Sequence, residues 1–159
     1  MSISAESLYE EDFYAWTQQQ AELLRRAPRV GNELDLENIA EEIETLGRGE
    51  RDAVRSQIRR IIEHLLKLAY SRAEPPRADW METVLDARQT LSDKITPTLR
   101  LDAEQHLDKL YADGRKRAGA ALRRYGEPQA ADALPQTCPY SLDDICREDW
   151  YPERPGGKS

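Results

Sequence analysis

The sequence predicts an all-α fold: a single-domain helical bundle of about five helices followed by a C-terminal strap. Apolar residues recur every three to four positions along most of the 159-residue chain, which is helical spacing. No segment shows the β-branched, turn-bounded pattern that is typical of strands. The length suits one domain of the commonest size. We therefore expect one domain over residues 1–153 and a disordered tail over residues 154–159.

The first two helices are predicted on either side of a turn at Pro28 and the Gly31-Asn32 pair. The first runs from about Tyr9 to Ala27. The second begins near Asp35, a plausible N-cap with Asn38 three residues later. Their inward positions are Tyr9, Phe13, Trp16, Gln20, Leu23 and Leu24 in the first, and Leu36, Ile39, Ala40, Ile43 and Leu46 in the second. Gly47 and Gly49 indicate a break or a kink, which leaves open whether the second helix continues into the third.

The third helix, over about 50–71, has the strongest apolar stripe in the chain. Pro75-Pro76 separates it from a fourth helix over about 78–95, and Thr96-Pro97 ends that one. A fifth helix is expected over about 101–125, with Gly126 as its C-cap. The stripes are Val54, Ile58, Ile61, Ile62, Leu65, Leu68 and Ala69, then Trp80, Val84, Ala87, Leu91 and Ile95, then Leu107, Leu110, Tyr111, Gly114, Ala118, Ala121, Leu122 and Tyr125.

After Pro128 the chain is expected to form a strap that lies over the bundle. Ser141 followed by Asp144 is typical of a capping box and predicts one short helix. The aromatic residues Tyr140, Trp150 and Tyr151 are expected to cover the core.

The net charge of −7 is unevenly distributed. Residues 1–50 carry 12 acidic and 4 basic side chains, whereas residues 51–100 carry 7 acidic and 10 basic ones. This opposition suggests that an acidic helix folds back on a basic one, although solvated faces with a chance bias would give the same pattern. The acidic balance argues against a nucleic-acid partner and against an anionic membrane surface.

The sequence also indicates the cellular compartment and whether a cofactor is expected. No run of about 18 apolar residues occurs, so no membrane-spanning helix is expected. The first residues lack the apolar core of a signal peptide, and we expect a cytoplasmic protein. Cys138 and Cys146 have no histidine nearby to complete a zinc site, and free thiols are expected. No nucleotide, phosphate or hydrolase motif is present, and no cofactor is expected.

One set of polar residues lies close to the apolar faces. Asp35, Asn38, Glu42 and Thr45 form a stripe along the edge of the apolar face of the second helix, which is either an ordinary polar flank or a candidate site. Arg88 lies among the apolar positions of the fourth helix and is therefore expected to point toward the interior of the bundle. Since a guanidinium stays charged, it needs acceptors there, and we expect it to pair with Glu42 or Asp35, preferably with Glu42.

His64 lies on the flank of the third helix, where a histidine is either solvated or a base or ligand. Glu42 and His64 could contribute to a metal site, but the Glu-x-x-His pairs of di-iron bundles are missing. Four basic residues also lie on the outer side of the third helix. They could bind phosphate, but pairing with acidic residues of the first two helices or of a partner protein is more economical. These residues are Arg51, Arg55, Arg59 and Arg60.

Several stretches carry a family resemblance. They are residues 8–16 (LYEEDFYAW), 33–47 (ELDLENIAEEIETLG), 64–67 (HLLK), 138–142 (CPYSL) and 150–152 (WYP). Together they resemble the bacterial domain of unknown function 29 over nearly the whole chain. The resemblance implies a small, all-helical bacterial protein and implies no activity. The residues that match characteristic positions of the family are Asp35, Asn38, Glu42, His64, Trp80 and Arg88.

Two functional hypotheses follow. The first is a non-enzymatic module that binds another protein or a second copy of itself, with Arg88 and Glu42 as an internal pair. The alternative is a small metal-binding or hydrolytic protein in which Glu42 or Asp35 is a ligand or base, His64 a ligand or proton carrier, and Arg88 an anion holder. A closed, mutually satisfied cluster would favour the first, and a pocket reaching Glu42 and His64 would favour the second.

Overall fold

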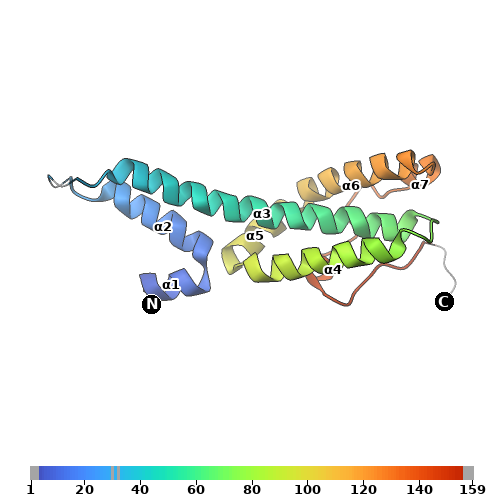
Figure 1. Ribbon diagram of the computed structural model, residues 1–159, viewed down its shortest axis with the longest axis horizontal. Coiled ribbons are helices and arrows are strands. Elements are labelled where there is room, and N and C mark those ends of the chain that lie inside the picture. The colour runs from blue at the N-terminus through green and yellow to red at the C-terminus, as the bar shows by residue number, and fades with distance from the viewer. Residues whose placement is uncertain (1–3, 30, 32, 156–159) are drawn as a thin grey trace.

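The computed structural model describes residues 4–155 apart from 30 and 32, and these residues form helices without any strand (Figure 1). This confirms the predicted all-α class. The helices are α1 (Ala5–Glu11), α2 (Phe13–Arg26), α3 (Leu36–Tyr70), α4 (Arg77–Lys94), α5 (Pro97–Gln105), α6 (Leu107–Arg124), α7 (Pro128–Asp132) and α8 (Leu142–Cys146).

The long helix α3 organises the molecule. It has 35 residues and is therefore about 52 Å long, and it runs through Gly47 and Gly49 without interruption. The predicted second and third helices are thus one continuous helix. Figure 1 shows α2 beside the N-terminal half of α3, and α4 and α6 beside its C-terminal half.

The C-terminal half of α3 is the centre of the main core. We call α4 to α8, the strap and α3 from residue 51 onward the body. Its buried apolar side chains come from all the long helices and from the strap, and they begin at Val54. They include Ile58, Ile61, Ile62 and Leu65 of α3, Val84 and Leu91 of α4, Leu99 of α5, Tyr111 and Leu122 of α6, and Tyr140 and Ile145 of the strap and α8.

The N-terminal half of α3 pairs with α2 to form an arm, which we define as residues 5–50. Only small side chains are buried between the two helices: Thr17 and Ala21 of α2, and Ala40 and Gly47 of α3. No residue of α1 is buried. The arm is therefore held by a narrow contact between close helix backbones rather than by a core of its own.

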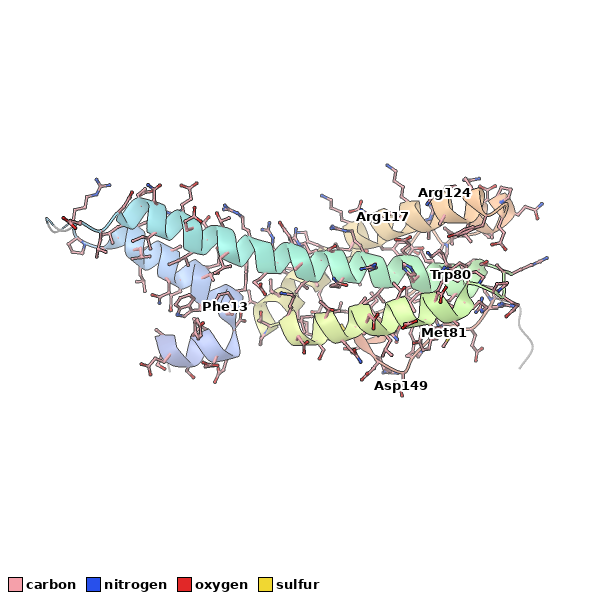
Figure 2. The ribbon with its side chains drawn as sticks, in the orientation of Figure 1. Phe13, Trp80, Met81, Arg117, Arg124 and Asp149 are labelled. Atoms are coloured by element: carbon pink, nitrogen blue, oxygen red, sulfur yellow. The ribbon has the colours of Figure 1, made fainter. Side chains whose placement is uncertain are left out.

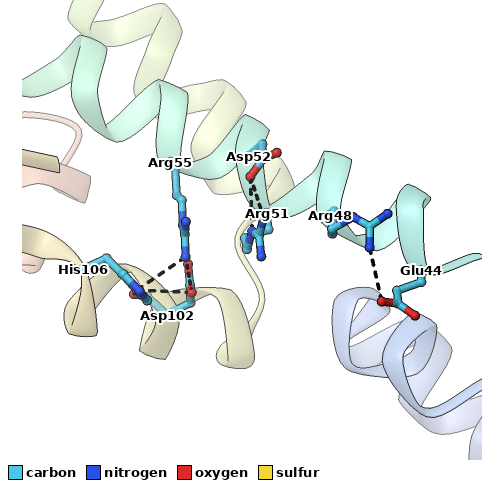
Figure 3. Close-up of polar contacts among 7 residues, drawn as sticks. All are labelled: Glu44, Arg48, Arg51, Asp52, Arg55, Asp102 and His106. Atoms are coloured by element: carbon cyan, nitrogen blue, oxygen red, sulfur yellow. Dashed lines mark hydrogen bonds and ion pairs between the residues drawn. The ribbon is translucent and has the colours of Figure 1, made fainter. Parts of the chain in front are cut away.

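Two helix breaks were not predicted. Asp12 separates α1 from α2, where a single helix over 9–27 was expected. His106 separates α5 from α6, and its Nδ1 donates to the carbonyl oxygen of Asp102 at 2.8 Å. Asp102 is also bound by both Nε and a terminal nitrogen of Arg55 on α3, at 2.9 and 2.7 Å (Figure 3). The Arg55 guanidinium lowers the pKa of the Asp102 carboxyl from its ordinary value.

The strap contains the predicted short helix α8 and also a second short helix, α7, which was not predicted. Ser141 and Asp144 form the predicted capping box of α8, and Gly126 has a φ of 79°, a conformation that suits glycine after the end of α6. Tyr140 is buried, and Trp150 and Tyr151 pack against the core. Arg154 pairs with Glu74 at 2.8 Å. Residues 156–159 of the predicted tail lie outside the described residues.

The distribution of charge differs from the expectation. An acidic helix was expected to fold back on a basic one. Instead α2, which carries Glu22, Arg25 and Arg26, packs on the acidic N-terminal half of α3, because α3 is continuous. The expected pairing of the third-helix arginines with the first two helices is wrong at two positions, since Arg55 pairs with Asp102 and Arg51 with Asp52. The acid excess of residues 1–50 is consequently concentrated in the arm.

The arm contact makes Gly47 sensitive to substitution. A Cβ atom at Gly47 would lie 2.1 Å from Oγ1 of Thr17, whereas one at Gly49 would meet nothing within 4 Å. We expect Gly47→Ala to lower the free energy of unfolding by about 1–2 kcal/mol through overpacking. Gly49→Ala is the matched control, which should raise it by about 0.5–1 kcal/mol because alanine favours helix. Urea unfolding followed by circular dichroism measures both, and equal stabilisation by the two variants would contradict the contact.

Candidate functional site

The predicted polar residues do not form one site. Asp35, Asn38 and Glu42 lie in the arm, at the beginning of α3. Glu42 and His64 are 22 residues apart on this same helix, a distance of about 33 Å along its axis. They cannot bind one ion or one substrate together, so the alternative site built on these two residues is wrong.

Asp35 and Asn38 act as a helix cap. Asp35 Oδ1 accepts a hydrogen bond from the Asn38 backbone nitrogen at 3.2 Å, and Oδ2 accepts one from Asn38 Nδ2 at 2.6 Å. Both residues are exposed. The pair satisfies the first turn of α3, as the sequence predicted for Asp35.

Arg88 is buried as predicted, but its predicted partner is wrong. Its guanidinium donates to the main-chain carbonyl oxygens of Ile145, Asp144 and Glu148, at 2.9, 3.0 and 3.3 Å. Glu42 is out of reach. Lys94 lies 3.4 Å from Glu50 across the antiparallel α3 and α4, which places Arg88 and Glu42 about 20 Å apart along the helices.

His64 belongs to a different cluster, together with Lys67 and Trp80. His64 Nδ1 donates to the Arg60 carbonyl oxygen at 2.9 Å. Lys67 is only 5% exposed, and its Nζ lies 3.6 Å from Glu63 and 5.2 Å from the centre of the Trp80 ring, which lies between α3 and α4 (Figure 2). Burial, and next the Lys67 ammonium, lower the pKa of His64, while burial also lowers that of Lys67. Each of these polar groups thus has a partner within the fold.

Within the part of the chain that the structure describes, no group of three or more histidine, cysteine, aspartate or glutamate side chains is arranged to hold a metal ion. A hollow of about 660 Å³ lies at the far end of the body. Its one carboxylate, Glu127, already accepts hydrogen bonds from the Ser71 hydroxyl at 2.6 Å and from the Arg72 backbone nitrogen at 2.8 Å. Glu127 therefore joins the end of α3 to the turn before α7.

The arm has a polar side. Around α3, Ala40 and Gly47 mark the line of contact with α2, and Glu44 lies on one side of that line. Arg25 of α2 contacts Glu44 there. Arg48 reaches the same carboxylate at 3.2 Å, and Figure 3 shows this second contact. These ion pairs fix the side of the arm on which the two helices present charge.

The other side of the arm is apolar. At 100° per residue, Ile39 and Leu46 of α3 lie across the contact line from Glu44, and Trp16 and Leu23 of α2 lie across it from Arg25. Leu23 and Leu46 are each 53% exposed and Ile39 is 37% exposed. Half-buried side chains of the two helices lie between these residues. We call this surface the arm face; it consists of Phe13, Trp16, Gln20, Leu23, Leu24, Leu36, Ile39, Ile43 and Leu46.

Aromatic residues line the lower end of the arm face, where α1 folds back on α2. The Tyr9 ring meets those of Phe13 and Trp16 edge to face, at 5.5 and 4.9 Å between centres. Figure 2 shows Phe13 at this end of α2, beside α1. A hollow of about 550 Å³ opens here, lined by Ala5, Glu6, Tyr9, Glu10 and Trp16. The arm face thus ends in an aromatic hollow with two carboxylates at its edge.

Sequence reasoning identified the residues of the arm face as core. All of them except Phe13 and Gln20 are aliphatic or indole side chains at helical spacing, and the same pattern is typical of a buried stripe. A signal was nevertheless present. The contact positions Thr17, Ala21, Ala40 and Gly47 are small, and small residues on one line of a helix indicate close approach of a single neighbour.

These features define a class: an all-helical protein with a packed body and a projecting two-helix arm that exposes an apolar face. Among the described helices, none combines the length and the apolar composition needed to cross a lipid bilayer. The chain matches the family described as domain of unknown function DUF29 over residues 8–151, and it belongs to that family.

Comparison with solved structures agrees with this assignment. The crystal structure of an α-helical protein of unknown function from Rhodospirillum rubrum is similar, with a TM-score of 0.74 and 35% sequence identity. The match covers 89% of this chain and 90% of that one. No match was found among curated proteins.

Proposed function

We propose that this protein is a non-enzymatic interaction module whose arm face binds an amphipathic helix of another protein. The observation that carries the proposal is the arm face itself. Two antiparallel helices present apolar side chains at i, i+3 or i+4, and i+7 spacing on one side, such as Ile39, Ile43 and Leu46. A third helix laid along such a pair buries its own apolar stripe, which is a common mode of peptide recognition.

Charge favours another protein over a second copy of this chain. The arm lies within residues 1–50, which carry 12 acidic and 4 basic side chains. Two arms placed face to face would bring two such acidic surfaces together, and like charges oppose association. The same acidity disfavours nucleic-acid and anionic membrane partners. The cytoplasmic location expected from the sequence is part of this proposal.

The test uses a synthetic 18-residue helical peptide of zero net charge. Its leucines recur at i, i+3, i+4 and i+7, and lysine and glutamate alternate elsewhere. Fluorescence anisotropy of the labelled peptide should show binding to the native protein. The double variant Leu23→Ser/Leu46→Ser should bind at least tenfold more weakly, since burying one leucine contributes about 1.5–3 kcal/mol.

Leu101→Ser is the matched control. Leu101 is 55% exposed, close to the 53% of Leu23 and Leu46, but it lies on α5 in the body. Equal binding by this control and by the double variant would contradict the proposal. Sedimentation of the peptide-free protein supplies a second criterion. A native dimer that Leu23→Ser/Leu46→Ser converts to monomer would show that a second copy occupies the arm face and would overturn the choice of partner.

A further inference from the structure

The acidic side chains around the arm face indicate what charge its partner carries. Glu42 is exposed and lies at the edge of the face, next to Ile39 and Leu46 on α3. No ion pair or hydrogen bond joins its side chain to another described residue. At the lower end of the face, Glu6 and Glu10 line the aromatic hollow and are exposed in the same way. Carboxylates without partners thus stand along one edge and at one end of this apolar surface.

The basic residues of the arm do not neutralise this edge. Arg25 and Arg48 are both held by Glu44 on the polar side, and Arg26 pairs with Glu22. These ion pairs use up three of the four arginines of residues 1–50. None of these three arginines pairs with Glu6, Glu10 or Glu42, so these carboxylates keep their negative charge beside the arm face, where a partner would lie.

The hollow adds a second feature that suits a cation. Tyr9 and Trp16 present aromatic rings, whose faces attract ammonium and guanidinium groups. Glu6 and Glu10 supply carboxylates that can form hydrogen bonds with the same groups. A lysine or arginine side chain could lay its apolar stem on the rings and direct its charged end to the carboxylates.

We infer that the helix bound by the arm face is basic: it has leucine-like residues on one side, and lysine or arginine residues that meet Glu42 at the edge of the face and the hollow at its lower end. The inference rests on the proposed function and specifies the partner of that same surface. Charge complementarity of this kind sets which partners are accepted and how fast they associate, more than the overall affinity.

Three peptides with identical leucine positions test the inference: one with lysine at all other positions, one with glutamate, and the zero-charge peptide described above. At 50 mM salt the lysine peptide should bind at least tenfold more tightly than the glutamate peptide. At 500 mM salt the preference should shrink to about threefold or less, because exposed charges are screened over a few ångströms at that concentration.

Charge variants locate the effect. Glu10→Gln/Glu42→Gln should reduce the preference for the lysine peptide by at least threefold and leave binding of the zero-charge peptide unchanged. Glu82→Gln/Glu153→Gln removes the same charge from exposed positions in the body, and it should leave the preference as in the native protein. An equal reduction by both double variants would overturn the inference, because the preference would then reflect net charge alone.

The outcomes separate the two proposals. If the zero-charge peptide binds and Leu23→Ser/Leu46→Ser weakens it, the proposed function stands. Equal binding of the lysine and glutamate peptides, or tighter binding of the glutamate peptide, would then overturn the basic partner alone. If none of the three peptides binds the native protein, both proposals fail.

Discussion

Replacing Arg88 by alanine is expected to lower the free energy of unfolding by about 3–5 kcal/mol, a loss typical of removing one partner from a buried charged contact. Arg88 is 2% exposed and donates to three carbonyl oxygens, those of Asp144, Ile145 and Glu148. Its guanidinium also lies 5.3 Å from the centre of the Tyr151 ring. Burial lowers the pKa of Arg88 from its ordinary value, but a guanidinium remains charged at neutral pH.

The loss should be visible as release of the strap. Trp150 packs on Tyr140 at 5.7 Å between ring centres, so detachment of the strap should expose Trp150 and shift its fluorescence to longer wavelength. Urea unfolding gives the free energy, and limited proteolysis after α8 gives the accessibility of the strap. Arg88→Lys should recover only part of the stability, since one ammonium cannot reproduce the fork of a guanidinium.

Arg147→Ala is the control for this experiment. Arg147 immediately follows α8 and is exposed, and its change should alter stability by no more than about 0.5 kcal/mol. If Arg88→Ala unfolds at the same urea concentration as Arg147→Ala, the three carbonyl contacts contribute nothing to the fold and the role assigned to Arg88 is wrong.

Arg88 shows which features of the body the sequence predicts and which it does not. The helical projection correctly placed this side chain inside, because the face of a helix on which a residue lies depends only on its spacing from the apolar stripe. Its partner depends on the strap, whose path no periodicity specifies. A carboxylate was the expected acceptor, yet carbonyl oxygens at the end of α8 carry partial negative charge and serve equally well.

The long helix shows a second limit. Gly47 and Gly49 lower helix propensity by about 1 kcal/mol each, which made a break reasonable. Tertiary contact overrides this cost at Gly47, because only a residue without a side chain lets α2 approach so closely. The sequence shows that residue 47 is glycine, but the reason for a glycine there becomes clear only from the position of α2 in the structure.

The arm face could not be predicted for a related reason. An apolar stripe has the same spacing whether a neighbouring helix covers it or not, and the residues of the arm were therefore assigned to the core. The core of the body begins at Val54 and therefore does not cover the arm face. By contrast, Asp35 was correctly identified as a cap, since capping depends on a few adjacent residues.

The second large effect is expected at Asp12, a residue hidden in the acidic run Glu10-Glu11-Asp12. Asp12 is 6% exposed, and its carboxylate caps two helices at once. Oδ1 accepts from the Ala15 backbone nitrogen of α2 at 3.0 Å, and Oδ2 from the Thr98 backbone nitrogen of α5 at 2.8 Å. Asp12 therefore joins the base of the arm to the body.

Asp12→Ala should lower the free energy of unfolding by about 2–4 kcal/mol, because each lost cap costs about 1–2 kcal/mol. Glu10→Ala, an exposed neighbour on α1, is the control and should change stability little. Hydrogen–deuterium exchange should localise the effect, with faster exchange in the first turns of α2 and α5 and unchanged exchange at Ile61 and Ile62 in the body. Uniformly faster exchange would instead indicate a general loss of stability.

The protonation of Asp12 gives an independent criterion. Burial alone would raise the pKa of Asp12, but the hydrogen bonds from Thr98 and Ala15 outweigh it and lower the pKa below the ordinary value of 3.8. A carboxyl whose pKa is lower in the folded state stabilises the fold above its unfolded pKa, and this contribution is lost as the pH falls through the folded pKa.

Asp12→Asn keeps the shape of the side chain and removes its titration. The native protein should be more stable than this variant at pH 6, and the difference should shrink below a pH of about 4. Asp102 and Glu44, whose pKa values their arginine partners also lower, are present in both proteins and cancel in the comparison. A difference that stays constant from pH 6 to pH 3 would show that the charge of Asp12 does not hold the arm to the body, and that its two caps act as neutral hydrogen bonds.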